Sequence, residues 1–248
     1  METLAWKTFS IEVRRRRGQR SHRLIVKPNG QILLTTALSV TRRDLVSFVA
    51  QSADWLDQSL AKAADHRRIN PPKTFTPGEQ FLFLGRPRAL GYMPTTNQVA
   101  KAFVSGDRLI VTVPKEKWRE FDGSIGWPEA RNLVRRYYES QARKILHERL
   151  TLLAQKMGLR PTKVSYRCQR TRWGSCSSSG EISLNWRLVA TPPSTIDYVI
   201  IHELAHLRHP NHSADFWRLV SNFAADMKFD KKWLKDHHQQ LEFLARPT

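Results

Sequence analysis

The chain has few cysteines, few acidic residues for its size and no long hydrophobic run. Its two cysteines, Cys168 and Cys176, are too few for a disulfide framework, and their spacing is not that of a C-x-x-C zinc clip. No apolar run is long enough to span a membrane. Segment 1–13 lacks the hydrophobic core of a secretion signal. These absences predict a reduced, cytoplasmic protein without a membrane partner.

The shortage of acidic residues leaves a large positive charge. Against 41 Lys and Arg there are 22 Asp and Glu, which gives a formal net charge of +19. Part of the excess is a run of six arginines, Arg14, Arg15, Arg16, Arg17, Arg20 and Arg23. Such a cluster attracts the phosphates of nucleic acid or nucleotides, but it is also typical of a solvated surface that favours solubility. The composition leaves both interpretations open.

The pattern of the first part predicts a β-rich region with one helix, spanning residues 1–115. Residues 9–13 alternate in polarity as a strand does, and the Pro28-Asn29-Gly30 turn lies between two apolar strands. Thr41 and Asp44 form a capping box that starts a helix. Further short strands are expected at 81–84, 100–104 and 109–113, and the polar segment 65–73 is a candidate linker.

A second domain is expected over residues 116–248, with the boundary between Val113 and Trp127. Pro128 stands at the head of an amphipathic segment that predicts a helix over 129–157. Residues 164–166 and 182–185 have strand composition and predict a small antiparallel sheet. The fold class expected for the whole chain is therefore α+β.

The sequence His202-Glu203-Leu204-Ala205-His206 is an H-E-x-x-H motif. On a helix, positions i and i+4 share one face, so His202 and His206 can direct their rings at a single cation. Glu203 is rotated from that line by about 100°. It can therefore reach a metal-activated water without binding the metal itself.

The flanking residues predict where this helix begins and ends. Ser194 and Asp197 fit a capping box at its start, and Pro210 cannot continue it. Asn211 suits a left-handed reversal that brings His212 back toward the first two histidines, and Ser213 suits the N-cap of the next helix. Three imidazoles with an open fourth position are typical of a catalytic zinc ion. His209 is expected at the surface and not as a ligand.

A resemblance to a known family enters at these residues. Five segments carry it: Thr171-Arg172-Trp173-Gly174-Ser175-Cys176-Ser177, the strand 182–185, the motif 202–206, Asn211-His212-Ser213 and Phe216-Trp217. Together they resemble the YgjP-like metallopeptidase family. That family is similar to the SprT-like and WLM zinc peptidases, some of which act on proteins attached to DNA. The resemblance implies a zincin-like domain in which His202, His206 and His212 bind one Zn²⁺ and Glu203 is catalytic. The spacing also coincides with the metzincin motif, but His209 stands at the glycine position of that motif and no Met-turn can be assigned.

The motif and the resemblance favour a zinc-dependent peptidase with Glu203 as general base and a protein or peptide as substrate. Arg172, Tyr198 or a backbone amide near Gly174 could stabilise the oxyanion, although Arg172 could equally stack on Trp173. Ser175 and Cys176 have no assigned base and are not expected to act as nucleophiles. Two other functions stay open: a metal-dependent hydrolase of phosphate-containing substrates such as nucleotides, and a nucleic-acid-associated module with a structural zinc. No Gly-rich phosphate loop is present, which counts against dedicated nucleotide binding.

Overall fold

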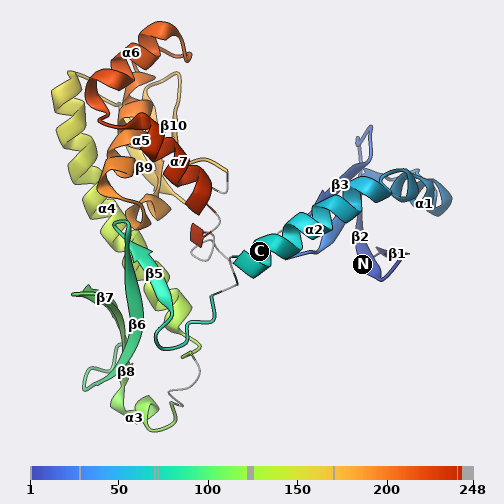
Figure 1. Ribbon diagram of the computed structural model, residues 1–248, viewed down its shortest axis with the longest axis horizontal. Helices are drawn as coiled ribbons and strands as arrows, with labels where there is room; N and C mark the ends of the chain where they lie inside the picture. Colours follow the sequence, from blue (N-terminus) through green and yellow to red (C-terminus); the bar gives the residue numbers. More distant parts are fainter. Residues whose placement is uncertain are drawn as a thin grey trace. The chain divides into compact units, whose positions relative to one another are not determined.

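The structure is a computed structural model that describes residues 2–27, 29–69, 71, 73–121, 126–169, 171–238 and 240–241. The chain divides into two compact units, Met1–Pro72 and Lys73–Thr248. Helices and three small sheets are combined in the described residues, which confirms the α+β class (Figure 1). Among these residues no helix is both long and apolar enough to cross a membrane.

The first unit is a four-stranded sheet, in the order β1-β2-β4-β3, with two helices. Apolar side chains of the sheet, such as Ile11 and Leu34, form a buried core with apolar side chains of the helices, such as Leu45. The predicted hairpin is confirmed, since β3 and β4 are antiparallel; Pro28 of its turn lies outside the described residues. The elements are β1 (Glu2–Trp6), β2 (Phe9–Arg16), β3 (Arg23–Val26), β4 (Ile32–Ala37), α1 (Arg42–Gln51) and α2 (Ala53–Ile69).

The helical part of this unit begins as predicted and is then divided. Both hydrogen bonds of the capping box between Thr41 and Asp44 are present. The expected single helix is split at Ser52, whose hydroxyl donates to the carbonyl of Phe48 at 2.9 Å. The Ser52 carbonyl in turn accepts from the amide of Leu56 at 2.9 Å, so the same residue ends α1 and supports the start of α2. Strand β1 was not predicted.

The second unit contains two sheets and the remaining helices. Its first sheet has the order β5-β6-β8-β7 and its second the order β10-β11-β9. The elements are β5 (Gln80–Phe83), β6 (Arg86–Thr95), β7 (Ala102–Ser105), β8 (Arg108–Pro114), α3 (Lys115–Trp118), α4 (Ala130–Met157), β9 (Lys163–Arg167), β10 (Gly174–Cys176), β11 (Glu181–Asn185), the short 3-10 helix η1 (Trp186–Ala190), α5 (Pro193–Ala205), α6 (Ala214–Phe223) and α7 (Met227–His237).

Two features of this unit differ from the sequence-based expectation. Strand β6 was not predicted, because Pro87, Gly91 and Pro94 are residues that normally argue against a strand interior. The small sheet is mixed and not antiparallel throughout: β11 pairs with β9 in parallel and with β10 antiparallel. The chain passes through β10 before it returns as β11, so β11 runs in the same direction as β9.

The break between the two units falls at the candidate linker 65–73, whereas Val113 and Trp127, at the two ends of the expected boundary, belong to the same buried core. Val113 of β8 and Val134 of α4 are both fully buried in that core. The turn between β5 and β6 also supports the start of α5, because an added Cβ on Gly85 would lie 2.8 Å from Cγ of Pro192. The expected boundary at residue 115 therefore does not separate two cores.

Candidate metal centre

Helix α5 holds the first two histidines of the motif and is buried on nearly every side, as expected. The capping box predicted at its start is wrong. The helix begins at Pro193, one residue before Ser194. Its N-cap residue is Pro192, and no side chain makes a capping hydrogen bond there. Ser194 donates instead to the carboxylate of Asp230 on α7, and Asp197 pairs with Arg149 of α4. Helix α5 is thus fixed by its neighbours and not by a local cap.

The chain reverses after α5 and brings His212 back. Its left-handed step was expected at Asn211, but outside glycine the described residues have positive φ only at Lys7, Phe75 and Leu84. The reversal starts instead in a tight turn, in which the amide of His209 donates to the carbonyl of Ala205 at 2.9 Å. The side chain of Ser213 then caps α6, as predicted.

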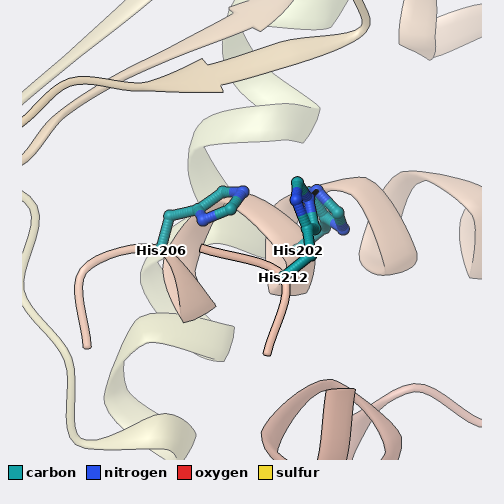
Figure 2. Close-up of side chains that lie close together, drawn as sticks. All are labelled: His202, His206 and His212. Carbon is teal, nitrogen blue, oxygen red and sulfur yellow. Dashed lines mark hydrogen bonds between the residues drawn. The ribbon is translucent and has the colours of Figure 1, made fainter. Parts of the chain in front are cut away.

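His202, His206 and His212 form one cluster whose ligand atoms all lie within 4.8 Å of one another (Figure 2). Nε2 of His202 lies 3.1 Å from Nε2 of His212. Nδ1 of His206 lies 3.1 Å from the carbonyl oxygen of His209, which leaves Nε2 of that ring for a ligand role. Among the described residues, no other group of three His, Cys, Asp or Glu side chains is arranged to hold a metal ion. The ring of His209 is not part of the cluster.

An aromatic pair from α6 supports the three rings. The buried ring of Phe216 lies 4.9 Å from the ring of His202, 4.6 Å from that of His206 and 4.8 Å from that of His212, between centroids. The ring of Trp217 stacks on that of His212, with centroids 5.5 Å apart. Nζ of Lys231 lies over the Trp217 ring, 3.8 Å from its centroid. His212 itself is exposed, so this stacking is what restrains the one ligand that comes from a loop.

The surroundings of His202 and His206 favour the neutral imidazole, which is the form that binds metals. Burial lowers the pKa of His202 to about 4, with further lowering by His206, His212 and Lys231. Burial also lowers the pKa of His206. These two rings are therefore ready to donate nitrogen lone pairs at neutral pH.

Glu203 is buried beside this cluster, with 6% of its surface exposed. Burial raises its pKa to about 7, while the charge of Arg172 opposes that rise. The carboxyl group lies directly against β10: an added Cβ on Gly174 would lie 2.6 Å from both Cγ and Oε1 of Glu203. A residue without a side chain is thus required at Gly174.

The loop before β10 is held by two buried side chains of the following strand and turn. Nδ2 of Asn185 donates to the carbonyls of Gln169 and Arg172, at 2.7 and 2.9 Å. The guanidinium of Arg187 donates to the same Gln169 carbonyl and lies 5.2 Å from the Trp173 ring centroid. The cation over Trp173 is therefore Arg187, whereas Arg172 is exposed and acts electrostatically on Glu203.

We expect Gly174→Ala to lower kcat for peptide hydrolysis by about 100-fold, because the new methyl group displaces the Glu203 carboxyl. Metal content should stay unchanged, since the three atoms nearest to the new methyl group all belong to Glu203, which is not one of the ligand side chains. Gly91→Ala is the matched control: Gly91 also lies in a strand, and an added Cβ there meets nothing within 4 Å. Steady-state kinetics and metal analysis of both variants check this prediction, and equal activity of the two would contradict it.

Several residues of the site were not recognised as such in the sequence. Three of them are Gly174, Asn185 and Arg187. What each does depends on how β10 and β11 pack, and no local sequence pattern shows that packing. The position of Phe216 could have been predicted, because it is apolar and lies only four residues after His212.

The chain is similar to one family model and to two solved structures. The family model "YgjP-like, metallopeptidase domain" matches residues 20–237. No curated protein matches the chain significantly. Among solved structures, the metallopeptidase zymogen abylysin of Pyrococcus abyssi is 27% identical with a TM-score of 0.34, covering 39% of this chain and 95% of that one. The metallopeptidase zymogen jannalysin of Methanocaldococcus jannaschii is 18% identical with a TM-score of 0.33, covering 38% and 95%.

The family match covers most of the chain, including the H-E-x-x-H helix, His212 and the loop that carries Gly174. Of the residues that carried the resemblance in the sequence, Gly174 lies against Glu203, and His202, His206 and His212 form the cluster. The chain therefore belongs to the YgjP-like family and carries its metallopeptidase domain.

Proposed function

We propose that the protein is a zinc-dependent peptidase in which His202, His206 and His212 bind the ion and Glu203 is the general base. The observation that carries this proposal is the buried carboxyl of Glu203 beside an open cluster of three imidazoles. A structural zinc site has four protein ligands, whereas the described residues supply three here. This open position favours catalysis over a purely structural ion.

The donor set fits zinc. Neutral imidazole nitrogens are ligands that zinc prefers, and with Zn–N bonds of about 2.1 Å a tetrahedral site places two nitrogens about 3.4 Å apart. Nε2 of His202 and Nε2 of His212 are 3.1 Å apart, close to that spacing. When bound, zinc would polarise the scissile carbonyl and acidify a water molecule.

The chain's own residues then move the proton. Glu203 accepts it from the attacking water and delivers it to the leaving amine. A pKa raised to about 7 suits a group that must both take up and release a proton near neutral pH. Gly174 leaves the space in which this carboxyl sits.

Two side chains are candidates for the oxyanion donor. Tyr198 lies one turn before His202, with ring centroids 6.1 Å apart, and burial raises its pKa to about 12, so its hydroxyl keeps the proton it would donate. Arg172 is exposed and close enough for its charge to act on Glu203. We favour Arg172, because its cation is exposed to an incoming substrate and its charge acts on the carboxyl of Glu203.

Strand β10 supports a peptide as the substrate. It is an edge strand of the sheet β10-β11-β9, and its Gly174 touches the general base. An extended peptide can pair with such an edge through main-chain hydrogen bonds, which places a peptide bond beside the reacting groups.

The experiment that tests this function compares two substrates. The purified, zinc-loaded protein is incubated with an unfolded protein and, separately, with nucleoside triphosphates, each alongside Glu203→Gln. We expect new peptide termini from the unfolded protein with wild type alone. Phosphate release that depends on Glu203, without any proteolysis, would contradict the peptidase and favour a metal-dependent hydrolase of phosphate-containing substrates such as nucleotides.

A further inference from the structure

The first unit contains a long stretch without acidic residues. Segment 13–43 holds nine Lys and Arg and no Asp or Glu, although acidic residues occur elsewhere in this unit. The stretch includes the end of β2, all of β3 and β4, and the start of α1. Its positive charge is thus not balanced locally along the chain.

The topology gathers most of these cations at one end of the sheet. Strands β2 and β4 are parallel, so their C-terminal ends lie together, with Arg16 opposite Ala37. Strand β3 is antiparallel to β4, so its first residue, Arg23, lies opposite Thr35 at the same end. The chain leaving β4 there leads into α1, whose first turn contains Arg43.

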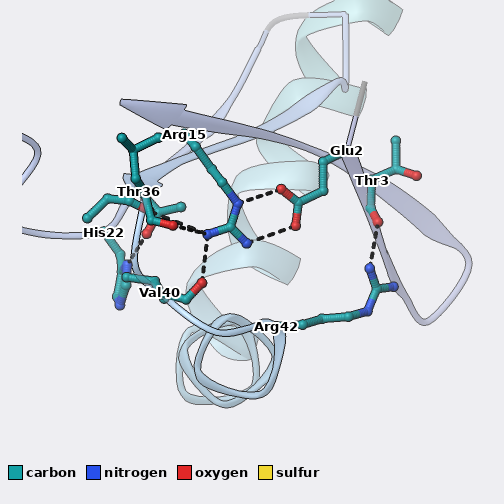
Figure 3. Close-up of polar contacts among 9 residues, drawn as sticks. Glu2, Thr3, Arg15, His22, Thr36, Val40 and Arg42 are labelled. Carbon is teal, nitrogen blue, oxygen red and sulfur yellow. Dashed lines mark hydrogen bonds and ion pairs between the residues drawn. The ribbon is translucent and has the colours of Figure 1, made fainter. Parts of the chain in front are cut away.

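Two arginines of the stretch serve the fold itself (Figure 3). Arg15 makes two hydrogen bonds to the carboxylate of Glu2, at 2.7 and 3.0 Å, and donates to the Val40 carbonyl at 2.6 Å. Arg42 donates to the Thr3 carbonyl at 3.3 Å. These contacts hold the loop between β4 and α1, and the loop between β2 and β3 is held to β4 where Nδ1 of His22 lies 2.9 Å from the hydroxyl of Thr36.

Arg14 pairs with Glu12 at 2.7 Å and Arg15 with Glu2, whereas the other arginines at this end form no ion pair with any residue that the structure describes. In the described part of the chain, none of five exposed arginines is paired with a carboxylate; they are Arg16, Arg17, Arg20, Arg23 and Arg43. We call them the arginine end. Solvated surfaces usually intersperse charges of both signs. Five like charges at one end of the sheet repel one another and favour a polyanion as partner.

The chemistry around the arginine end selects the kind of polyanion. Segment 13–43 contains no Phe, Tyr or Trp on which unpaired bases could stack. Guanidinium groups match phosphate oxygens, and a duplex carries the densest line of phosphates. We propose that the arginine end binds the phosphate backbone of double-stranded nucleic acid without reading its sequence.

The test measures binding of a fluorescent DNA duplex to the full-length protein by anisotropy over a range of salt concentrations. Arg16, Arg17, Arg20 and Arg23 are replaced together by glutamine. We expect the affinity at low salt to fall on the order of 100-fold, and the slope of log K against log salt to decrease by about one for each arginine removed. Peptide hydrolysis without DNA should stay unchanged.

Two further variants keep the test decisive. The same four positions as lysine retain the charge, and this variant should bind within about threefold of wild type because the contacts are mainly electrostatic. Glutamine at four exposed cations of α4 removes equal charge elsewhere, at Arg136, Arg143, Lys144 and Lys156. Unchanged binding in the arginine variant, or an equal loss in the α4 variant, would overturn the proposal. So would arginine-dependent binding to anionic vesicles with no binding to the duplex.

Discussion

Replacing Glu203 by glutamine is expected to lower kcat for peptide hydrolysis by about 10²–10⁴-fold, the usual contribution of a general acid–base. Glutamine keeps the shape that fits against Gly174 but cannot accept a proton. The residue is not among the three ligand side chains, so the variant should bind zinc as wild type does. Steady-state kinetics together with metal analysis of the same sample checks both parts.

The unfolding temperature provides the control for this variant. Because the buried carboxyl is costly in its charged form, glutamine should leave the protein at least as stable as wild type. A variant that is folded, zinc-loaded and still fully active would remove Glu203 from the mechanism. A variant that loses zinc would instead assign the carboxyl to the metal.

His212→Ala is expected to weaken zinc binding by at least about 100-fold, since even partners one step removed from a metal contribute 10–100-fold. Hydrolysis should fall with the zinc content. His212 comes from the loop after α5, and its loss leaves only His202 and His206 as protein ligands. A water molecule in the place of His212 would bind the ion more weakly than the imidazole does. Competition with a chelator of known affinity measures the change.

His209→Ala is the matched control. The His209 ring lies outside the cluster, and its backbone carbonyl, which faces Nδ1 of His206, remains after the substitution. We expect its zinc affinity to be close to that of wild type. Equal weakening in both variants would contradict the assignment of His212 as the third ligand.

The local part of this site could be predicted from the sequence. A fixed helical geometry places His202 and His206 on one face. The helix ends at Ala205, before the Pro210 that was expected to stop it. The start of the helix could not be predicted, because the partners of Ser194 and Asp197 are Asp230 and Arg149, far away along the chain. Ser194 and Asp197 fit the pattern of a local cap, but both make hydrogen bonds to distant parts of the chain instead.

The same limit applies to the fold. Strand β6 is paired on both sides, by β5 and β8. These neighbours stabilise the strand although its prolines and glycine argue against one in the sequence. The division of the chain was ambiguous because the change of character after Pro114 lies within one core. Long-range pairing and continuous packing decide such cases, and neither leaves a periodic pattern.

The most direct test of the central claim is a zinc titration of the metal-free protein in which hydrolysis of an unfolded protein is followed at each addition. Three histidines around one open position predict no activity without metal and a linear rise that ends at about one equivalent of zinc. Full hydrolysis by the metal-free protein would contradict the account.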